Sequence, residues 1–256
     1  MPTTRSADGL SISWEEWPDA DPDGVPVLLA HAFVSTTKGT WADTRIIPAL
    51  VDAGRRVVGV DARGHGRSEC PHDPSFYGEA SMARDLRAVV DDLGCTTYDL
   101  VGYSMGAIVA LHVAAADPRV RRLVVAGVGA AVVERGGIDD RVVPGELLVR
   151  ALLTEDPSTL PLRVTGFRKL ADANGSDRRA LAAHASVRSD EPVALHAVTA
   201  PTLVIAGDTD PLAERPDVLA DALADARVEI VPGDHMKALT ARRFRELLVA
   251  ELGRGA

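Results

Sequence analysis

The stretch YDLVGYSMG, residues 98–106, carries the strongest fold signal in the chain. A short apolar run leads into Gly-x-Ser-x-Gly, and the helix-forming residues 105–116 follow at once. A serine between a buried strand and a helix sits on a sharp turn, with its hydroxyl at the helix N-terminus, where backbone N–H groups favour negative charge. Gly102 and Gly106, two positions to either side, let strand and helix approach closely. The stretch therefore predicts a strand, a turn and a helix, with Ser104 as a candidate nucleophile at the turn.

Outside this stretch, short apolar runs alternate with longer segments of helical period. Strands are expected at residues 10–17, 27–30, 56–61, 98–103, 123–127, 202–207 and 228–231. Helices are expected at residues 42–53, 79–93, 105–116, 216–224 and 240–252. This alternation predicts an α/β fold with a mostly parallel, doubly wound sheet. The first strand, in which apolar and polar residues alternate, is expected to be antiparallel, with one face wetter than the other.

Residues 131–198 break this rhythm. They contain no strand-like run, and helical segments are expected at 145–153, 162–173 and 177–187. An insertion of roughly 65 residues is far longer than the usual connection between a strand and a helix. We therefore expect an α/β core formed by residues 1–130 and 199–256, and a small helical cap, residues 131–198, over one end of the sheet. The alternative is a peripheral helical excursion without a function.

The chain offers seven histidines as the base that would take the proton of the serine. His235 follows the last expected strand and precedes the C-terminal helix. It therefore lies at the carboxyl end of a strand, at the sheet edge that also carries Ser104. His31 and His65 also follow strand ends, so they remain rivals.

Two aspartates, Asp208 and Asp210, follow the strand expected at residues 202–207. A carboxylate at this edge of the sheet can orient the imidazole and stabilise its cation. The residue type suits both aspartates, so the choice between them stays open on this ground.

Five motifs stand at or near strand ends. They are HAF at 31–33, DARGHGRS at 61–68, GYSMG at 102–106, GDTDP at 207–211 and GDH at 233–235. Together they make nearly the whole chain resemble the α/β-hydrolase family, in its esterase, perhydrolase and carbon–carbon hydrolase group. The resemblance, with the family's chain order Ser, Asp, His, implies Asp210 as the acid and His235 as the base. Epoxide hydrolases and dehalogenases of this fold would instead carry Asp at the position of Ser104.

The resemblance also implies two backbone N–H groups that would bind the oxyanion of an acyl-transfer reaction, those of Met105 and Phe33. Ala32 stands where the family commonly has a glycine, and an alanine fits without strain only where φ is negative. The Arg-Gly-His-Gly stretch resembles a structural turn below the site. Its His65 is interpreted as a packing residue, and Asp61 and Arg63 are expected to form an ion pair.

A substrate pocket is expected beneath the cap. His31, Trp41 and Tyr103 are candidate pocket residues, with packing in the core as the alternative. The cap segment carries apolar side chains that can wall a pocket or pack the cap onto the sheet: Leu147, Leu148, Leu152, Leu160, Leu162, Phe167 and Leu170.

The composition argues against several classes of protein. Hydrophobic residues at 46% and charged residues at 25% are ordinary values for a globular protein. A net charge of −9 argues against a nucleic-acid partner. Two cysteines, no N-terminal apolar run and no span of roughly 18 apolar residues favour a cytoplasmic protein without a membrane span. Neither a P-loop nor metal-ligand spacing is found, so we expect no cofactor and no metal.

These observations favour a serine hydrolase that cleaves carboxylic esters through an acyl-enzyme, a carboxylesterase of the EC 3.1.1 type. The expected partner is a small-molecule substrate with an apolar acyl group, and the pattern indicates no particular oligomeric state. The same residues also fit a carbon–carbon bond hydrolase, a lyase or a perhydrolase, because a fold does not determine one reaction. A non-catalytic binding protein with the same fold is the remaining alternative.

Overall fold

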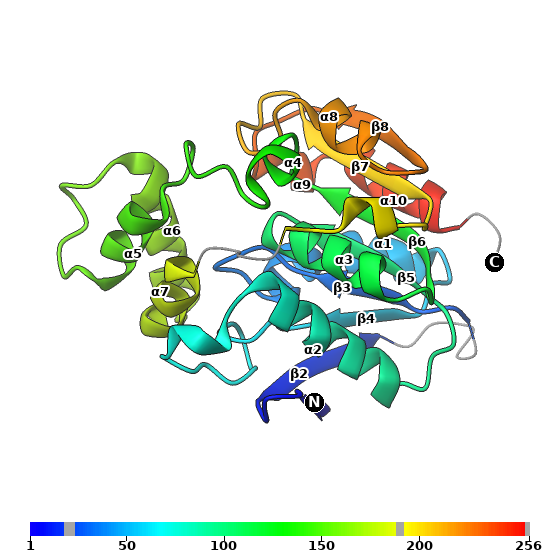
Figure 1. Ribbon diagram of the computed structural model, residues 1–256, viewed down its shortest axis with the longest axis horizontal. Helices are drawn as coiled ribbons and strands as arrows, with labels where there is room; N and C mark the ends of the chain where they lie inside the picture. The colour runs from blue at the N-terminus through cyan, green and yellow to red at the C-terminus, as the bar shows by residue number, and fades with distance from the viewer. Residues whose placement is uncertain (18–23, 188–191, 254–256) are drawn as a thin grey trace.

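An eight-stranded sheet runs through the molecule, with helices on both of its faces (Figure 1). The computed structural model describes residues 1–17, 24–187 and 192–253. The strands are β1 (Thr3–Arg5), β2 (Ser11–Trp17), β3 (Val27–Ala30), β4 (Val57–Val60), β5 (Tyr98–Tyr103), β6 (Val120–Ala126), β7 (Thr202–Gly207) and β8 (Ala226–Val231). Their order across the sheet is β1-β2-β4-β3-β5-β6-β7-β8. Only the pairs β1–β2 and β2–β4 are antiparallel, so the predicted mostly parallel sheet is confirmed.

The burial of the strands explains why most of their sequences are short, continuous apolar runs. Every residue of β3, β4, β5 and β7 is buried, because helices cover both faces of a parallel sheet. β2 is antiparallel, as predicted, and only its residues Ile12 and Ser13 are buried. β1 was not predicted, since three residues without apolar alternation carry no strand signal; it is held by its pairing with β2.

The helices divide into two layers and a separate group. They are α1 (Ile46–Asp52), α2 (Glu79–Asp92), α3 (Met105–Ala116), α4 (Ala131–Arg135), α5 (Gly145–Leu153), α6 (Leu162–Ala173), α7 (Arg178–Ser186), α8 (Pro216–Asp221), α9 (Lys237–Thr240) and α10 (Arg242–Leu252), with short turns of other helix types at η1 (Lys38–Ala42), η2 (Pro74–Phe76) and η3 (Leu195–Ala197). Apolar residues of α2, α3 and α8 pack on one face of the sheet, and those of α1, α9 and α10 pack on the other. The core is therefore doubly wound.

Two expected helices are interrupted by the backbone. The helix expected at residues 42–53 is split into η1 and α1 because Arg45 adopts a left-handed conformation, with φ 66°. The helix expected at 240–252 is split into α9 and α10 at Ala241, which is extended. No glycine or proline stands at either break, so the sequence pattern predicted one continuous helix at each place.

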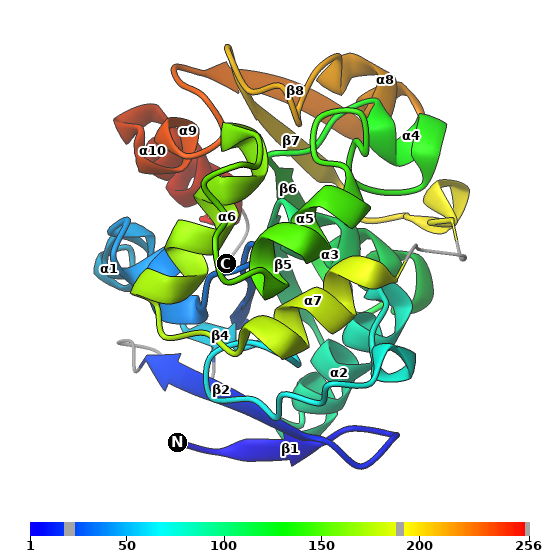
Figure 2. The ribbon, with the colours of Figure 1, turned by 90° about the vertical axis from the view of Figure 1, so that its left-hand side faces the viewer.

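The helices α5, α6 and α7 lie beyond one end of the strands (Figures 1 and 2). They pack on one another through an apolar cluster of their own, which also includes Val34 from the loop after β3. Within the described part of residues 131–198 there is no strand, in line with the sequence pattern. The division of the chain into a core and a cap remains a prediction.

The backbone is tightly packed at the turn between β5 and α3. A Cβ at Gly106 would lie 2.1 Å from the carbonyl oxygen of Ala30 in the neighbouring strand. A Cβ at Gly102 would lie 2.2 Å from the carbonyl oxygen of Gly106. Both clashes are with backbone atoms, so the two glycines are required by the close approach of helix and sheet.

We predict that Gly106→Ala lowers the free energy of unfolding by about 3 kcal/mol, because main chain must move to admit the methyl group. Gly166→Ala is the matched control: Gly166 lies on the exposed side of α6 with no atom within 4 Å of an added Cβ. That control should raise stability by ~1 kcal/mol, the usual gain for alanine over glycine in a helix. Urea unfolding of both variants measures the difference, and a Gly106→Ala protein as stable as the parent would contradict the packing argument.

Candidate active site

Ser104 occupies the sharp turn between β5 and α3. Its backbone has φ 55° and ψ −118°, a conformation that non-glycine residues rarely adopt. The Ser104 N–H donates a hydrogen bond to the carbonyl of Ala126 at 2.8 Å, which ties the turn to β6. The side chain therefore stands at the start of α3, at the carboxyl end of the central strand β5.

The structure brings Ser104, His235 and Asp210 together. His235 Nε2 lies 3.0 Å from Ser104 Oγ, and His235 Nδ1 lies 2.8 Å from Asp210 Oδ2. The three side chains come from the ends of β5, β7 and β8, since the carboxyl ends of parallel strands share one edge of the sheet. Asp210 is buried, and its Oδ1 accepts the N–H of Leu212 at 2.9 Å, which fixes the carboxylate.

Asp208, the other aspartate after β7, has a different place. Its Oδ1 accepts the N–H of Gly233 at 2.8 Å, in the loop that carries His235. It is exposed and supports the base of that loop. The structure therefore separates two residues that the residue type alone left equivalent.

Tyr103 contacts His235 through its ring and its hydroxyl. The ring centroids of the two residues are 5.3 Å apart, and the Tyr103 hydroxyl donates to the carbonyl oxygen of His235. Burial raises the pKa of Tyr103, with further contributions from Asp210 and Asp234, so its hydroxyl keeps its proton and remains a donor. The loop that carries His235 is thus tied to the strand that carries Ser104.

Phe33 and Met105 flank the same site. Within the described residues, neither backbone N–H has a protein acceptor, and both residues line the cavity beside Ser104. Ala32 is not among the described non-glycine residues with positive φ, so its methyl group causes no backbone strain. The left-handed residue of this loop is Val34, with φ 58°, whose N–H donates to His65 Nε2 at 3.2 Å.

A cavity of about 390 Å³ opens at Ser104. Its walls come from the loops after β3 and β7, from α2 and α3, and from the segment between α4 and α7. The residues that line it are Phe33, Glu79, Ser104, Met105, Arg135, Gly137, Ile138, Asp140, Val143, Gly145, Leu148, Phe167, His184, Ala185, Val187 and Leu212. Most are apolar, so the cavity is suited to a largely apolar ligand.

The pocket residues expected from the sequence lie elsewhere. Trp41 is fully buried in the core between the sheet and α1, and Tyr103 lies beneath His235. His31 is 1% exposed and its Nε2 accepts the N–H of Ala62 at 2.9 Å, so it holds two loops together. None of the three lines the cavity at Ser104.

Some apolar residues of the expected cap line the cavity, and others pack the helices against one another. Leu148 and Phe167 line the cavity. Leu147, Leu152, Leu160 and Leu170 pack within the α5–α7 cluster, and Leu162 is 83% exposed. His184, Arg135 and Glu79 line the cavity although no motif or period pointed to them.

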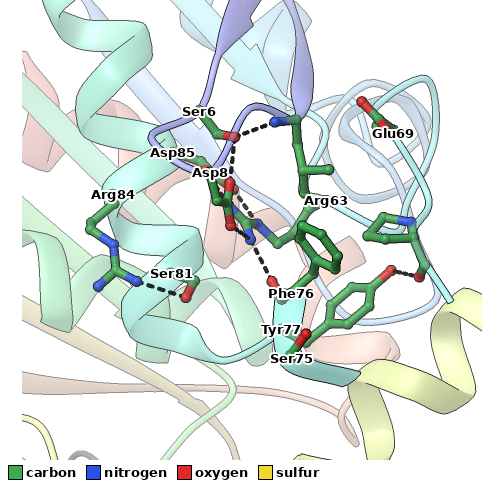
Figure 3. A network of polar contacts seen from close by, with 12 residues as sticks. Ser6, Asp8, Arg63, Glu69, Ser75, Phe76, Tyr77, Ser81, Arg84 and Asp85 are labelled. Atoms are coloured by element: carbon green, nitrogen blue, oxygen red, sulfur yellow. Dashed lines mark hydrogen bonds and ion pairs between the residues drawn. The ribbon is translucent and has the colours of Figure 1, made fainter. Parts of the chain in front are cut away.

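The expected ion pair between Asp61 and Arg63 is wrong. Arg63 is buried and pairs with Asp85 of α2 at 2.7 Å and with Asp8 at 2.6 Å (Figure 3). Asp61 instead accepts the backbone N–H groups of Thr37 and Arg67. A short carboxylate directly after β4 reaches the neighbouring loops, whereas the long Arg63 side chain extends to α2 and the N-terminal hairpin.

His65 and His184 are both buried beside the cavity wall. Desolvation by burial lowers the pKa of His65 well below its ordinary value, with His31 and His184 adding to the effect. Burial also lowers the pKa of His184 to about 4, and His31 and Arg63 contribute further. Both imidazoles are therefore neutral at pH 7.

The described residues hold no helix that is both long enough and apolar enough to cross a membrane. The same residues contain no group of three or more His, Cys, Asp or Glu side chains arranged to bind a metal ion.

Comparison with known proteins assigns the family. The family model for the alpha/beta hydrolase fold matches residues 25–152, half of the chain. The chain therefore belongs to the alpha/beta hydrolase fold family.

Individual relatives agree with this family and differ in their activities. A hydrolase from Pseudomonas aeruginosa has 26% identity and a TM-score of 0.75, over 100% of this chain and 98% of that chain. An esterase from Exiguobacterium antarcticum has 25% identity and a TM-score of 0.72, over 98% of each chain. Epoxide hydrolase A of Mycobacterium tuberculosis is 33% identical over 108 residues, 42% of this chain and 33% of that protein. The chain spans about a third of the length of the curated relatives it matches.

The depressed pKa of His184 predicts a pH dependence of stability. Its folded pKa lies below the unfolded value of 6.5, so the unfolded chain binds the extra proton first as the pH falls. The parent should therefore lose about 2 to 3 kcal/mol more stability between pH 7 and pH 4 than His184→Gln, which does not titrate there. Urea unfolding at a series of pH values measures this, and parallel curves for the two proteins would contradict it.

Proposed function

We propose that this protein is a serine hydrolase that cleaves carboxylic esters of small molecules. The observation that carries the proposal is the pair of hydrogen bonds that links Asp210 through His235 to Ser104, beside a largely apolar cavity. A serine, a base within hydrogen-bond reach and a carboxylate that orients the base are the parts that nucleophilic acyl transfer needs.

In the proposed mechanism, His235 Nε2 takes the proton of Ser104 Oγ as this oxygen attacks the ester carbonyl. Asp210 holds the Nδ1–H of His235 and stabilises the imidazolium that forms. His235 then gives its proton to the leaving alkoxide, and the alcohol departs. The same imidazole takes a proton from a water molecule as this water attacks the acyl-enzyme. It then returns the proton to Ser104 Oγ as the acid is released.

The negative charge on the carbonyl oxygen needs donors that are already in place. The N–H groups of Met105 and Phe33 are proposed for this role, because both flank Ser104 and neither has a protein acceptor within the described residues. The N-terminus of α3 adds a favourable dipole at the same point. The apolar wall of Phe33, Leu148 and Phe167 would receive the acyl group, and residues 131–198 would act as the cap that closes it in.

The relatives bear on the choice of reaction. The esterase from Exiguobacterium antarcticum matches over nearly all of both chains, whereas the epoxide hydrolase matches over a minority of each. An epoxide hydrolase of this fold would be expected to carry Asp where this chain has Ser104. The carbon–carbon hydrolase, lyase and perhydrolase reactions use the same three side chains, and mass spectrometry of the products distinguishes them from ester cleavage.

A fluorophosphonate tests the nucleophile without a choice of substrate. We expect one covalent adduct on the parent protein, measured as intact mass, and none on Ser104→Ala. Ser158→Ala, which removes an exposed hydroxyl from a loop, is the matched control and should react like the parent. A parent protein that stays unmodified, or a Ser104→Ala protein that is modified, would rule out the proposed mechanism.

The two aspartates after β7 provide a second test. Asp210→Asn should lower kcat for an aryl ester by about 10³-fold or more, because the imidazole loses its orienting carboxylate. Asp208→Asn keeps an acceptor for the N–H of Gly233 and should retain activity within about threefold, since the pair affected is exposed. Equal losses in the two variants would mean that Asp210 has no special role.

A further inference from the structure

His184 is a polar side chain without a protein partner in the wall of the cavity. It lies on α7, is 6% exposed and lines the same cavity as Ser104. Its Nδ1 is enclosed and makes no hydrogen bond, and no hydrogen bond of Nε2 is found within the described residues. Because Nδ1 is enclosed, Nε2 is the nitrogen that a ligand in the cavity can reach. Buried polar groups are almost always paired, so an imidazole nitrogen without a protein partner in the cavity wall points to a ligand that completes it.

Three aromatic rings pack against the His184 imidazole. Tyr77 stacks on it, with centroids 5.3 Å apart and planes at 9°. Phe33 and His65 meet it edge to face, at 5.2 Å and 5.9 Å. The imidazole packs against these three rings and also lines the cavity, so the cavity is the side from which a ligand can reach it.

The stacking ring of Tyr77 is itself fixed from outside the cavity (Figure 3). Its hydroxyl donates to the carbonyl of Pro71 at 2.6 Å. Arg63, buried between Asp8 and Asp85, also donates to the carbonyl of Phe76, the residue before Tyr77. A buried ion-pair network therefore holds the segment against which His184 packs.

The surroundings decide which ligand group fits. The imidazole is neutral at pH 7, so it offers one N–H donor and one acceptor nitrogen. Phe33 and Phe167, whose rings lie 6.2 Å apart, make this part of the wall apolar. Arg135 and Asp140, which also line the cavity, lie 3.6 Å from one another as an ion pair. A neutral oxygen, which needs no counter-ion, suits this part of the wall better than a charged group.

We propose that His184 binds a hydroxyl or keto oxygen on the acyl chain, so that the preferred substrates are esters of hydroxy- or oxo-acids. This inference rests on the ester hydrolysis proposed above and names the substrate class of the same site. His184 acts as a specificity-determining residue and takes no part in proton transfer. The apolar side chains of the cavity hold the carbon chain, and His184 selects the chain that carries an oxygen.

The test compares p-nitrophenyl hexanoate with its 3-oxo, 4-oxo and 5-oxo derivatives. For each ester, kcat/KM is divided by the value for the plain hexanoate, first in the parent and then in His184→Phe. Dividing the parent ratio by the variant ratio cancels the intrinsic reactivity of each ester. We expect this quotient to reach about tenfold for at least one oxo position, the effect of one lost hydrogen bond.

Three further variants make the comparison specific. His184→Leu is a second apolar replacement if the phenylalanine does not fit between Tyr77 and Phe33. His184→Gln keeps a donor and an acceptor and should retain part of the preference. His196→Phe makes the same substitution at an exposed histidine of η3, which does not line the cavity, and should leave every ratio at the parent value.

The outcomes separate the two proposals. A quotient near one at all three positions in both apolar variants overturns the role of His184 and leaves ester hydrolysis in place. The same holds if His196→Phe shifts the ratios as much as His184→Phe. A parent that hydrolyses none of the esters and forms no fluorophosphonate adduct overturns the proposed function, and this inference with it.

Discussion

The contact on which the rest of the structure depends is the approach of the first turn of α3 to the backbone of β3. At Gly106 the helix lies so close to the carbonyl of Ala30 that no Cβ fits between them. Beside this contact Ser104 adopts a positive φ of 55°, with its side chain at the N-terminus of the helix and at the edge where β7 and β8 also end. Asp210 and His235 then need only short loops to reach it. One packing constraint in the backbone thus sets the geometry of all three side chains.

Much of this arrangement was open to prediction because it depends on local signals. Buried parallel strands read as short apolar runs, and β3, β5 and β7 begin and end where those runs do. Their carboxyl ends share one edge, so residues at strand ends can be expected to meet even when they are far apart in the chain. Residue type left Asp208 and Asp210 equivalent, and the family resemblance favoured the one that the structure places against His235.

The residues of the cavity wall could not be predicted from the sequence, because they are brought together by contacts between distant segments. His184 lies within a helix without a motif, and its burial comes from Tyr77, Phe33 and His65, which belong to other segments. Arg63 stands two residues from Asp61, yet its partners come from α2 and from the loop after β1. The same holds for Trp41 and Tyr103, whose large rings fill the doubly covered core. Such contacts depend on how segments pack in space, and the sequence pattern has no period or spacing that encodes them.

The Arg63 network suggests why buried charge is retained beneath an apolar wall. Removing Arg63 and Asp85 from water is costly, and a well-packed apolar replacement is often equally stable. Apolar side chains do not make directional contacts, whereas hydrogen bonds do. The Arg63 guanidinium donates to Asp8, Asp85 and the carbonyl of Phe76, and so fixes three segments relative to one another. Tyr77 follows directly on Phe76 and stacks on His184, so this fixed geometry reaches the cavity. The orientation of the His184 imidazole on α7 thus depends on the ion pairs of Arg63 with Asp8 and Asp85. These ion pairs lie outside the cavity wall to which His184 belongs.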